Sequence, residues 1–252
     1  MRRPSLAVLV VLLAASTAAC GGGPKASGDP FGRTAAPSPY PERAAPARLD
    51  PARFSSHIDH PYWPMRPGSR WTYREVDPRG GRRRVEVTVG DQTRTILGVE
   101  ARVVHDTLTV DGRLVEQTDD WYAQDADGNV WYLGEQTREF HDGTTTTKGS
   151  WQAGVDGARP GILLPAHPRP GMSYQQERYD GRAEDRATVL SLGMRAKVPY
   201  GFFDHLLITK EWTPLQPSVL EHKFYAPGVG PVLAITVSGG SGREELLRFD
   251  RA

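Results

Sequence analysis

The sequence of 252 residues predicts an all-β protein with a single antiparallel curved sheet, a β-barrel or half-barrel, after a disordered N-terminal tether. Asp-Gly pairs recur from Asp111-Gly112 to Asp180-Gly181, and this dipeptide suits tight hairpin turns. Between the turns, β-branched and aromatic residues alternate with polar ones, as in strands that bury one face. No stretch shows the apolar spacing of a capped helix.

The expected strands follow one another at short intervals. Apolar residues alternate over 85–89, and again over 206–212 and 233–237. The run over 99–110 changes phase at its middle, which predicts a β-bulge or a sharp bend of the kind that closes a barrel. The irregular segment 154–171 predicts either a crossover that seals the core or a lid over a cavity.

Residues 1–19 have the layout of a lipoprotein signal peptide. Arg2 and Arg3 form a basic start, an unbroken apolar run covers 6–13, and small residues lead to Cys20. The apolar run is too short to span a bilayer. An ordinary signal peptide with a chance cysteine near its cleavage site is the alternative.

The segment Thr17-Ala18-Ala19-Cys20 resembles a bacterial lipobox, with Thr17 where Leu is usual. The resemblance implies a diacylglyceryl group on the sulfur of Cys20, cleavage before Cys20, and further acylation with a chain such as palmitate. Two or three acyl chains anchor a protein stably where one does not. The expected location is therefore the cell membrane, lipid-anchored and facing outside the cytoplasm.

Residues 20–53 are predicted to be the lipidated cysteine and a disordered tether, and 54–252 a β-rich globular domain. The tether is rich in Gly, Ala and Pro and has no hydrophobic periodicity. Its expected role is a spacer between the membrane and the folded domain.

The charge and the cysteine content of the chain argue against nucleic-acid binding and against an intramolecular disulfide. The formal net charge is +1, from 31 Lys and Arg against 30 Asp and Glu, which gives no electrostatic basis for binding nucleic acid. Cys20 is the single cysteine, so no intramolecular disulfide can form. The sequence predicts no cofactor.

The stretch Glu221-His222-Lys223-Phe224-Tyr225-Ala226-Pro227-Gly228-Val229-Gly230 carries a family resemblance. It is similar to the ends of uncharacterised bacterial secreted proteins and lipoproteins of the all-β class. These are distantly like half-barrel lipoprotein-carrier domains. The resemblance implies a barrel-like fold and transfers no catalytic residue.

Two segments have the residue types of metal sites. His57, Asp59 and His60 offer two imidazoles and a carboxylate, which suit zinc or copper. The alternative is a polar segment that leads into the sheet. Residues 125–129, Asp-Ala-Asp-Gly-Asn, resemble the opening of a calcium loop, although a hairpin turn explains the same letters.

Polar residues in expected strands form a second candidate site. They mark a polar cavity if they face inward and an ordinary solvated edge if they face outward. These residues are Lys210, Glu211, Glu221, His222 and Lys223. A further set of acids is interpreted as solvated strand faces, with paired carboxylates for acid–base chemistry as the alternative: Glu116, Asp119, Asp120, Glu177, Glu184 and Asp185.

The function predicted from these features is that of a non-enzymatic binding or scaffold module on the membrane. Its partners would be the membrane, through the lipid on Cys20, and a small apolar ligand or an envelope protein. The alternative is a metal-binding protein or an envelope hydrolase that uses His57, Asp59 and His60.

Overall fold

The computed structural model describes residues 49–76, 82–141 and 143–252. Fifteen strands and one short 3-10 helix, η1 (Pro51–Arg53), make up its regular structure. The strands of the first half are β1 (Phe54–Ser55), β2 (Arg70–Val76), β3 (Arg82–Ile96), β4 (Val99–Val110), β5 (Arg113–Asp125), β6 (Val130–His141), β7 (Thr144–Thr146) and β8 (Trp151–Gln152). Those of the second half are β9 (Gly161–Leu164), β10 (Ser173–Gln175), β11 (Arg186–Val198), β12 (Gly201–Trp212), β13 (Leu220–Ala226), β14 (Gly230–Ser238) and β15 (Arg243–Asp250).

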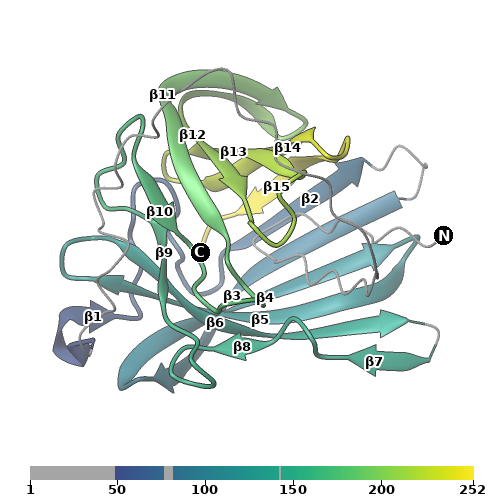
Figure 1. Ribbon diagram of the computed structural model, residues 1–252. Coiled ribbons are helices and arrows are strands. Elements are labelled where there is room, and N and C mark those ends of the chain that lie inside the picture. Colours follow the sequence, from purple (N-terminus) through teal and green to yellow (C-terminus); the bar gives the residue numbers. More distant parts are fainter. Residues whose placement is uncertain (1–48, 77–81, 142) are drawn as a thin grey trace, which may run out of the picture.

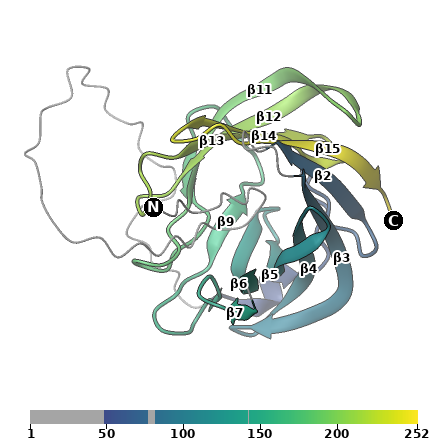
Figure 2. The ribbon, with the colours of Figure 1, turned by 90° about the vertical axis from the view of Figure 1, so that its right-hand side faces the viewer.

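All strands belong to one antiparallel sheet. Its order is β10-β11-β12-β13-β14-β15-β2-β3-β4-β5-β6-β7, with β1 paired to β5 and both β8 and β9 paired to β6. The sheet curls strongly, so that β13–β15 and β3–β6 lie on opposite sides of an interior (Figures 1 and 2). The predicted all-β class and curved sheet are confirmed. No helix within the described part of the chain is long and apolar enough to cross a bilayer.

The two ends of the curl approach each other without joining. Strand β9 pairs with β6, and Arg159 bridges to Arg178 in the segment after β10. A Cβ atom on Gly161 would lie 2.1 Å from the carbonyl oxygen of Gln176, so only glycine permits this approach of the two backbones. Residues 161–164 are all buried. Segment 154–171 therefore seals the core at this place, as the crossover interpretation predicted.

Strand register determines which side chains face the interior. In antiparallel pairs, directly opposite residues point to the same face of the sheet. Val87 of β3 lies opposite Asp106 of β4, and Val89 lies opposite Val104. Val103 and Val104 are both buried, on opposite faces, which confirms the predicted change of phase in β4. The irregularity itself lies in β3, between Val89 and Thr93.

Aromatic rings fill part of the interior. Trp63, from the loop before β2, lies 6.0 Å from the Tyr122 ring of β5 and 6.2 Å from the Tyr225 ring of β13. Tyr122 stacks on Tyr132 at 4.8 Å, and Trp151 meets Tyr132 edge-on. These rings join strands from both sides of the curl, so they form part of the core.

The described structure begins inside the segment predicted as tether. Asp50 caps η1 by accepting a hydrogen bond from the backbone N–H of Ala52, and Arg53 pairs with Asp127 at 3.0 Å. Residues 50–53 therefore contact the folded domain. The predicted signal peptide, Cys20 and the predicted tether up to residue 48 lie outside the described residues.

Candidate functional site

Carboxyl groups are concentrated on the concave face of the sheet. Asp120 of β5 lies directly opposite Glu135 of β6, and Asp106 of β4 lies opposite Thr118 of β5. Across the curl, Glu244 of β15 lies opposite Glu75 of β2. All these acids are buried. The same acidic face is extended by five further acids: Glu116, Glu177, Asp185, Glu211 and Glu221.

Short hydrogen bonds tie part of this face together. The Tyr132 hydroxyl donates to the Asp120 carboxylate at 2.5 Å. The hydroxyls of Thr118 and Thr137 lie 3.0 Å apart, and Thr137 donates to one oxygen of Glu135 at 3.1 Å. These bonds hold the β5 and β6 carboxyl groups in defined positions.

Several carboxylate oxygens on the acidic face have no hydrogen-bond partner among the described residues. Both oxygens of Glu244 are in this state, although the residue is only 1% exposed. One carboxylate oxygen each of Asp106, Glu135 and Glu177 also lacks a hydrogen-bond partner among the described residues. An unpaired buried carboxylate is costly, because it has lost water without gaining a donor. The acidic face is thus short of hydrogen-bond donors and of positive charge.

The surroundings raise the pKa of these acids. Burial is the largest cause and neighbouring carboxylates add to it. It raises the pKa of Glu116 to about 7 and that of Asp185 to about 7. Burial and the Asp120 carboxylate raise the pKa of Glu135 well above its usual range. For Glu244, burial acts together with the charges of Asp106 and Glu75.

The same direction holds for the remaining buried acids. Burial, then the charges of Asp120 and Glu116, raises the pKa of Asp106 well above its usual range. Burial also outweighs the hydrogen bond from Tyr132 and raises the pKa of Asp120. Burial and the charge of Asp185 also raise the pKa of Glu177 well above its usual range. Burial thus favours the protonated form of all these acids.

Two basic side chains lie among the acids, and each already pairs with one of them. Lys223 of β13 places its Nζ 2.7 Å from Glu211, and only 13% of its side chain is exposed. Burial opposes the Lys223 charge, but Glu211 and Glu221 outweigh it and hold the pKa above its usual range. Arg83 pairs with Glu75 at 2.5 Å. Lys223 also lowers the pKa of Glu244, but burial and the charges of Asp106 and Glu75 outweigh it.

The structure divides the predicted polar set in two. Glu211 lies opposite Glu221 on the concave face, where Thr236 donates to Glu221 at 3.1 Å. Lys223 shares that face through its ion pair with Glu211. Lys210 and His222 also lie opposite each other, but each is adjacent in its strand to a residue of the concave face. Because side chains alternate along a strand, these two point to the other face. Three of the five residues therefore contribute to the acidic interior.

His57, Asp59 and His60 are not brought together. His57 and Asp59 are exposed, and Asp59 accepts a hydrogen bond from the Gln124 amide at 2.6 Å. His60 is 1% exposed, with Nε2 3.1 Å from the Pro165 carbonyl and Nδ1 accepting from the Tyr62 backbone. Both imidazole nitrogens are thereby occupied. Over the described ranges, no group of three or more His, Cys, Asp or Glu could hold a metal ion.

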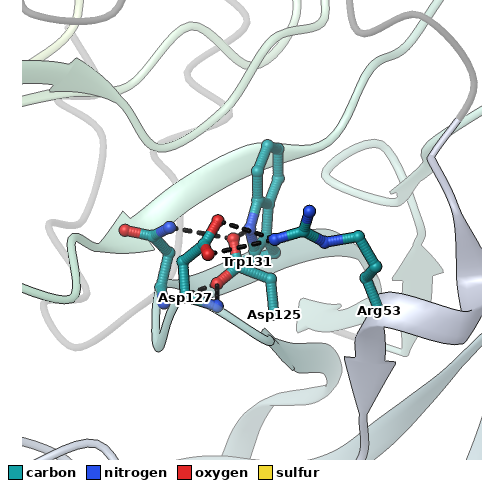
Figure 3. A network of polar contacts seen from close by, with 5 residues as sticks. Arg53, Asp125, Asp127 and Trp131 are labelled. Carbon is teal, nitrogen blue, oxygen red and sulfur yellow. Dashed lines mark hydrogen bonds and ion pairs between the residues drawn. The ribbon is translucent and has the colours of Figure 1, made fainter.

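The segment resembling a calcium loop is the turn between β5 and β6, as the hairpin interpretation predicted. The Asp125 carboxylate accepts from the backbone N–H groups of Asp127 and Asn129, from the Asn129 amide, and from the Trp131 ring nitrogen at 2.7 Å. Figure 3 shows this carboxylate beside the Arg53–Asp127 ion pair. Its two oxygens are thus used in closing the turn.

Sequence reasoning missed most of the acidic interior. Interpreting Asp120 and Glu177 as solvated is wrong, because both are buried. Glu116 and Asp185 are partly buried, and burial raises the pKa of each to about 7. Asp119, by contrast, pairs with His105 at 2.6 Å in a partly exposed position. Glu184 is also partly exposed and accepts a hydrogen bond from the backbone N–H of Gly181.

Asp106, Glu135 and Glu244 belong to none of the sites predicted from the sequence. A signal for Asp106 was present, since it stands in phase between the apolar residues Val104 and Leu108. Glu244 likewise stands two residues before the buried Leu246. An acid at an in-phase position of an alternating strand predicts a buried carboxyl group.

Comparison with known proteins identifies no family. No family model and no curated protein matches the chain. One solved structure that matches is described as an exported protein with a YmcC-like fold, from Bacteroides fragilis NCTC 9343. The two sequences are 13% identical, and the structures align with a TM-score of 0.44. The alignment covers 75% of this chain and 99% of the other. Another, described as a lipoprotein, is from Parabacteroides distasonis ATCC 8503, with 12% identity, a TM-score of 0.41, and coverage of 75% and 98%. Neither description mentions a lipoprotein carrier, so the predicted likeness to half-barrel carriers gains no support.

Proposed function

We propose that the protein is a membrane-anchored extracytoplasmic lipoprotein that acts as a non-enzymatic binding module, with the concave face of its sheet as the ligand site. The observation that carries the proposal is Glu244, a buried carboxyl group with no hydrogen-bond partner among the described residues. A stable fold gains nothing from such a group by itself, because its desolvation is uncompensated. A bound ligand would supply the missing donors.

The electrostatics favour binding over hydrolysis. A pair of carboxyl groups that performs acid–base catalysis needs one protonated and one ionised member, which requires environments that push their pKa values apart. Here burial raises the pKa of Asp106, Glu135 and Glu244 in the same direction. The acidic face therefore resembles a uniform binding surface more than a catalytic pair.

Native mass spectrometry of the full chain, extracted from membranes in mild detergent, tests this function. We expect a complex heavier than the denatured chain by the mass of a small organic molecule, because the concave face would be occupied in the cell. A control with chelator present should leave that mass unchanged. A bare chain from every preparation, or an added mass that the chelator removes, would contradict the proposal.

Cys20→Ala tests the anchor. We expect the variant to move from the membrane fraction to the soluble extracytoplasmic fraction, because each buried methylene of an acyl chain contributes about 0.8 kcal/mol to membrane affinity. Fractionation and the intact mass of the mature chain measure this. Thr17→Leu is the matched control and should stay on the membrane, since Leu is the usual residue at that lipobox position. A Cys20→Ala protein that remains on the membrane would contradict lipidation as the anchor.

A further inference from the structure

The acidic interior holds more carboxyl groups than the two basic side chains among them, Lys223 and Arg83, can balance. Lys223 and Arg83 are each engaged by an acid of their own, Glu211 and Glu75. Glu244 keeps both carboxylate oxygens without a partner among the described residues. The same holds for one oxygen each of Asp106, Glu135 and Glu177. These atoms accept hydrogen bonds and cannot donate them when ionised.

We propose that the ligand of the concave face is a small organic polycation, a linear polyamine, whose ammonium groups bond to the unpartnered carboxylates of Glu244, Asp106 and Glu135. This inference rests on the proposed function and names its ligand class. Each ammonium group carries three donors and no acceptor, which complements a surface of acceptors. Hydrogen bonds between charged partners are also the strong ones.

The arrangement favours an organic cation over a bare metal ion. Metal ions need several ligands converging on one point, and no such group of three exists within the described residues. The carboxyl groups come instead from different strands, with Asp106 on β4, Asp120 on β5 and Glu135 on β6. Asp120 and Glu135 lie directly opposite each other, whereas Asp106 lies opposite Thr118, two residues before Asp120. Because neighbouring strands lie about 4.8 Å apart, the three carboxyl groups form a diagonal row across the sheet. An elongated ligand with amines separated by short methylene spacers matches such a row.

Aromatic rings provide the apolar part of the same surface. Tyr122 and Tyr132 stack at 4.8 Å beside Asp120, and the Tyr132 hydroxyl bonds to that carboxylate. Tyr73 of β2 is buried on the same face, near Glu244 and Asp106. Aromatic faces attract organic cations and also cover methylene groups. Glu116 and Glu221 are only partly buried, so the acidic face reaches solvent at these residues.

Ligand and protons compete for this site. Glu244 is surrounded by Glu75 and Tyr73 of β2, Asp106 of β4, and Glu221 and Lys223 of β13. Asp106 faces Asp120 and Glu116 of β5. Acids whose ionisation is disfavoured give up their protons to the solvent when an ammonium group arrives, and the ammonium group keeps its own. Binding therefore releases protons and strengthens as the pH rises.

Isothermal titration calorimetry of the detergent-solubilised full chain with spermidine, after removal of any co-purified ligand, tests the inference. We expect saturable binding whose affinity falls at least tenfold from pH 8.5 to pH 6.5, because one proton released per ligand gives about tenfold per pH unit. Titration in two buffers of different ionisation enthalpy counts the protons. A pH-independent affinity, with no protons released, would overturn the inference.

Glu244→Gln and Asp106→Asn test the residues. Both keep the shape of the side chain and remove its charge, so we expect folded proteins that bind spermidine at least tenfold more weakly at pH 8.5. Glu86→Gln is the matched control, since Glu86 lies on the other face of β3 beside Arg84 and should bind like the parent. Equal losses in all three variants would assign the binding to general surface charge and overturn the site.

Two further titrants separate the possible failures. Magnesium chloride at equal charge and N,N′-diacetylspermidine should both bind far more weakly than spermidine. If magnesium binds as tightly, or if none of the cations binds, the polycation inference fails. The proposed binding function survives that failure when native mass spectrometry still shows a neutral or acidic organic molecule on the chain. It fails as well when the chain is bare.

Discussion

Lowering the pH from 8.5 to 6.5 is expected to raise the Tm of the ligand-free protein, whereas acidification destabilises many proteins. Burial raises the pKa of Glu116 and Asp185 to about 7, well above the value of an unfolded chain. A raised native pKa means that the folded state binds the proton more tightly. This stabilisation is complete below the unfolded pKa and is lost as the pH rises through the folded pKa.

The expected size follows from proton uptake. For each additional proton held by the native chain, the free energy of unfolding rises by about 1.4 kcal/mol per pH unit lowered. For a domain of this size, 1 kcal/mol shifts the Tm by roughly 2–4 °C. Two opposing groups are His60 and His222, whose pKa burial lowers, but they act mainly below their usual pKa near 6.5. Scanning calorimetry over pH 6.5–8.5 should therefore show a rise of at least about 4 °C.

Glu244→Gln should make that pH dependence shallower and raise the Tm at pH 8.5. The amide has no charge to desolvate and brings donors into a region of carboxylate acceptors. Its neighbours there are Glu75, Asp106 and Glu221, and Lys223 is the cation nearby. Glu86→Gln, on the opposite face, should leave the slope unchanged. A parent protein whose Tm falls on acidification over this range would show that the interior carboxyl groups are ionised in the native state.

Lys223→Met is expected to be the most destabilising single substitution of this interior at pH 8.5. Its ammonium group lies 2.7 Å from Glu211 and also offsets the charges of Glu221 and Asp185. Removing one partner of a buried ion pair costs about 3–5 kcal/mol, because the other charge stays buried without compensation. Urea unfolding monitored by circular dichroism should show a loss of that order.

Three comparisons separate this electrostatic cause from a packing defect. The loss in Lys223→Met should shrink on acidification to pH 5.5, where Asp185, whose pKa burial raises to about 7, takes up a proton. The double variant Glu211→Gln/Lys223→Met should recover most of the stability at pH 8.5. Lys210→Met, on the opposite face of the adjacent strand, should change little. A loss that is the same at both pH values and in the double variant would indicate lost packing of the lysine stem.

Local patterns account for the elements that sequence reasoning predicted well. The Asp-Gly pair at Asp127-Gly128 closes the β5–β6 turn, where Gly128 has a φ of 94°. The phase change at Val103 and Val104 marks a real irregularity between β3 and β4. Such signals survive in a single sequence because turn geometry and alternating burial act over a few neighbouring residues.

The acidic interior is not local in this sense. Glu244 of β15 lies near Asp106 of β4 because β15 pairs with β2 across most of the chain, which leaves only β2 and β3 between the two strands in a curled sheet. No sequence distance or spacing reports that pairing. Lys210 and His222 point outward, whereas Lys223 points inward. This difference follows from the register between β12 and β13, which is defined only once the two strands pair.

The sequence by itself determined the all-β class, the positions of many turns, and the leader with Cys20 that predicts export and lipidation. The tertiary structure alone decided which acids are buried and which cations reach them. The alternation of apolar and polar residues predicts that one face of a strand is buried, but it does not predict which side chains that face will contact. Whether a carboxyl group such as Glu244 meets a base, a hydroxyl or another acid depends on strands far apart in the chain.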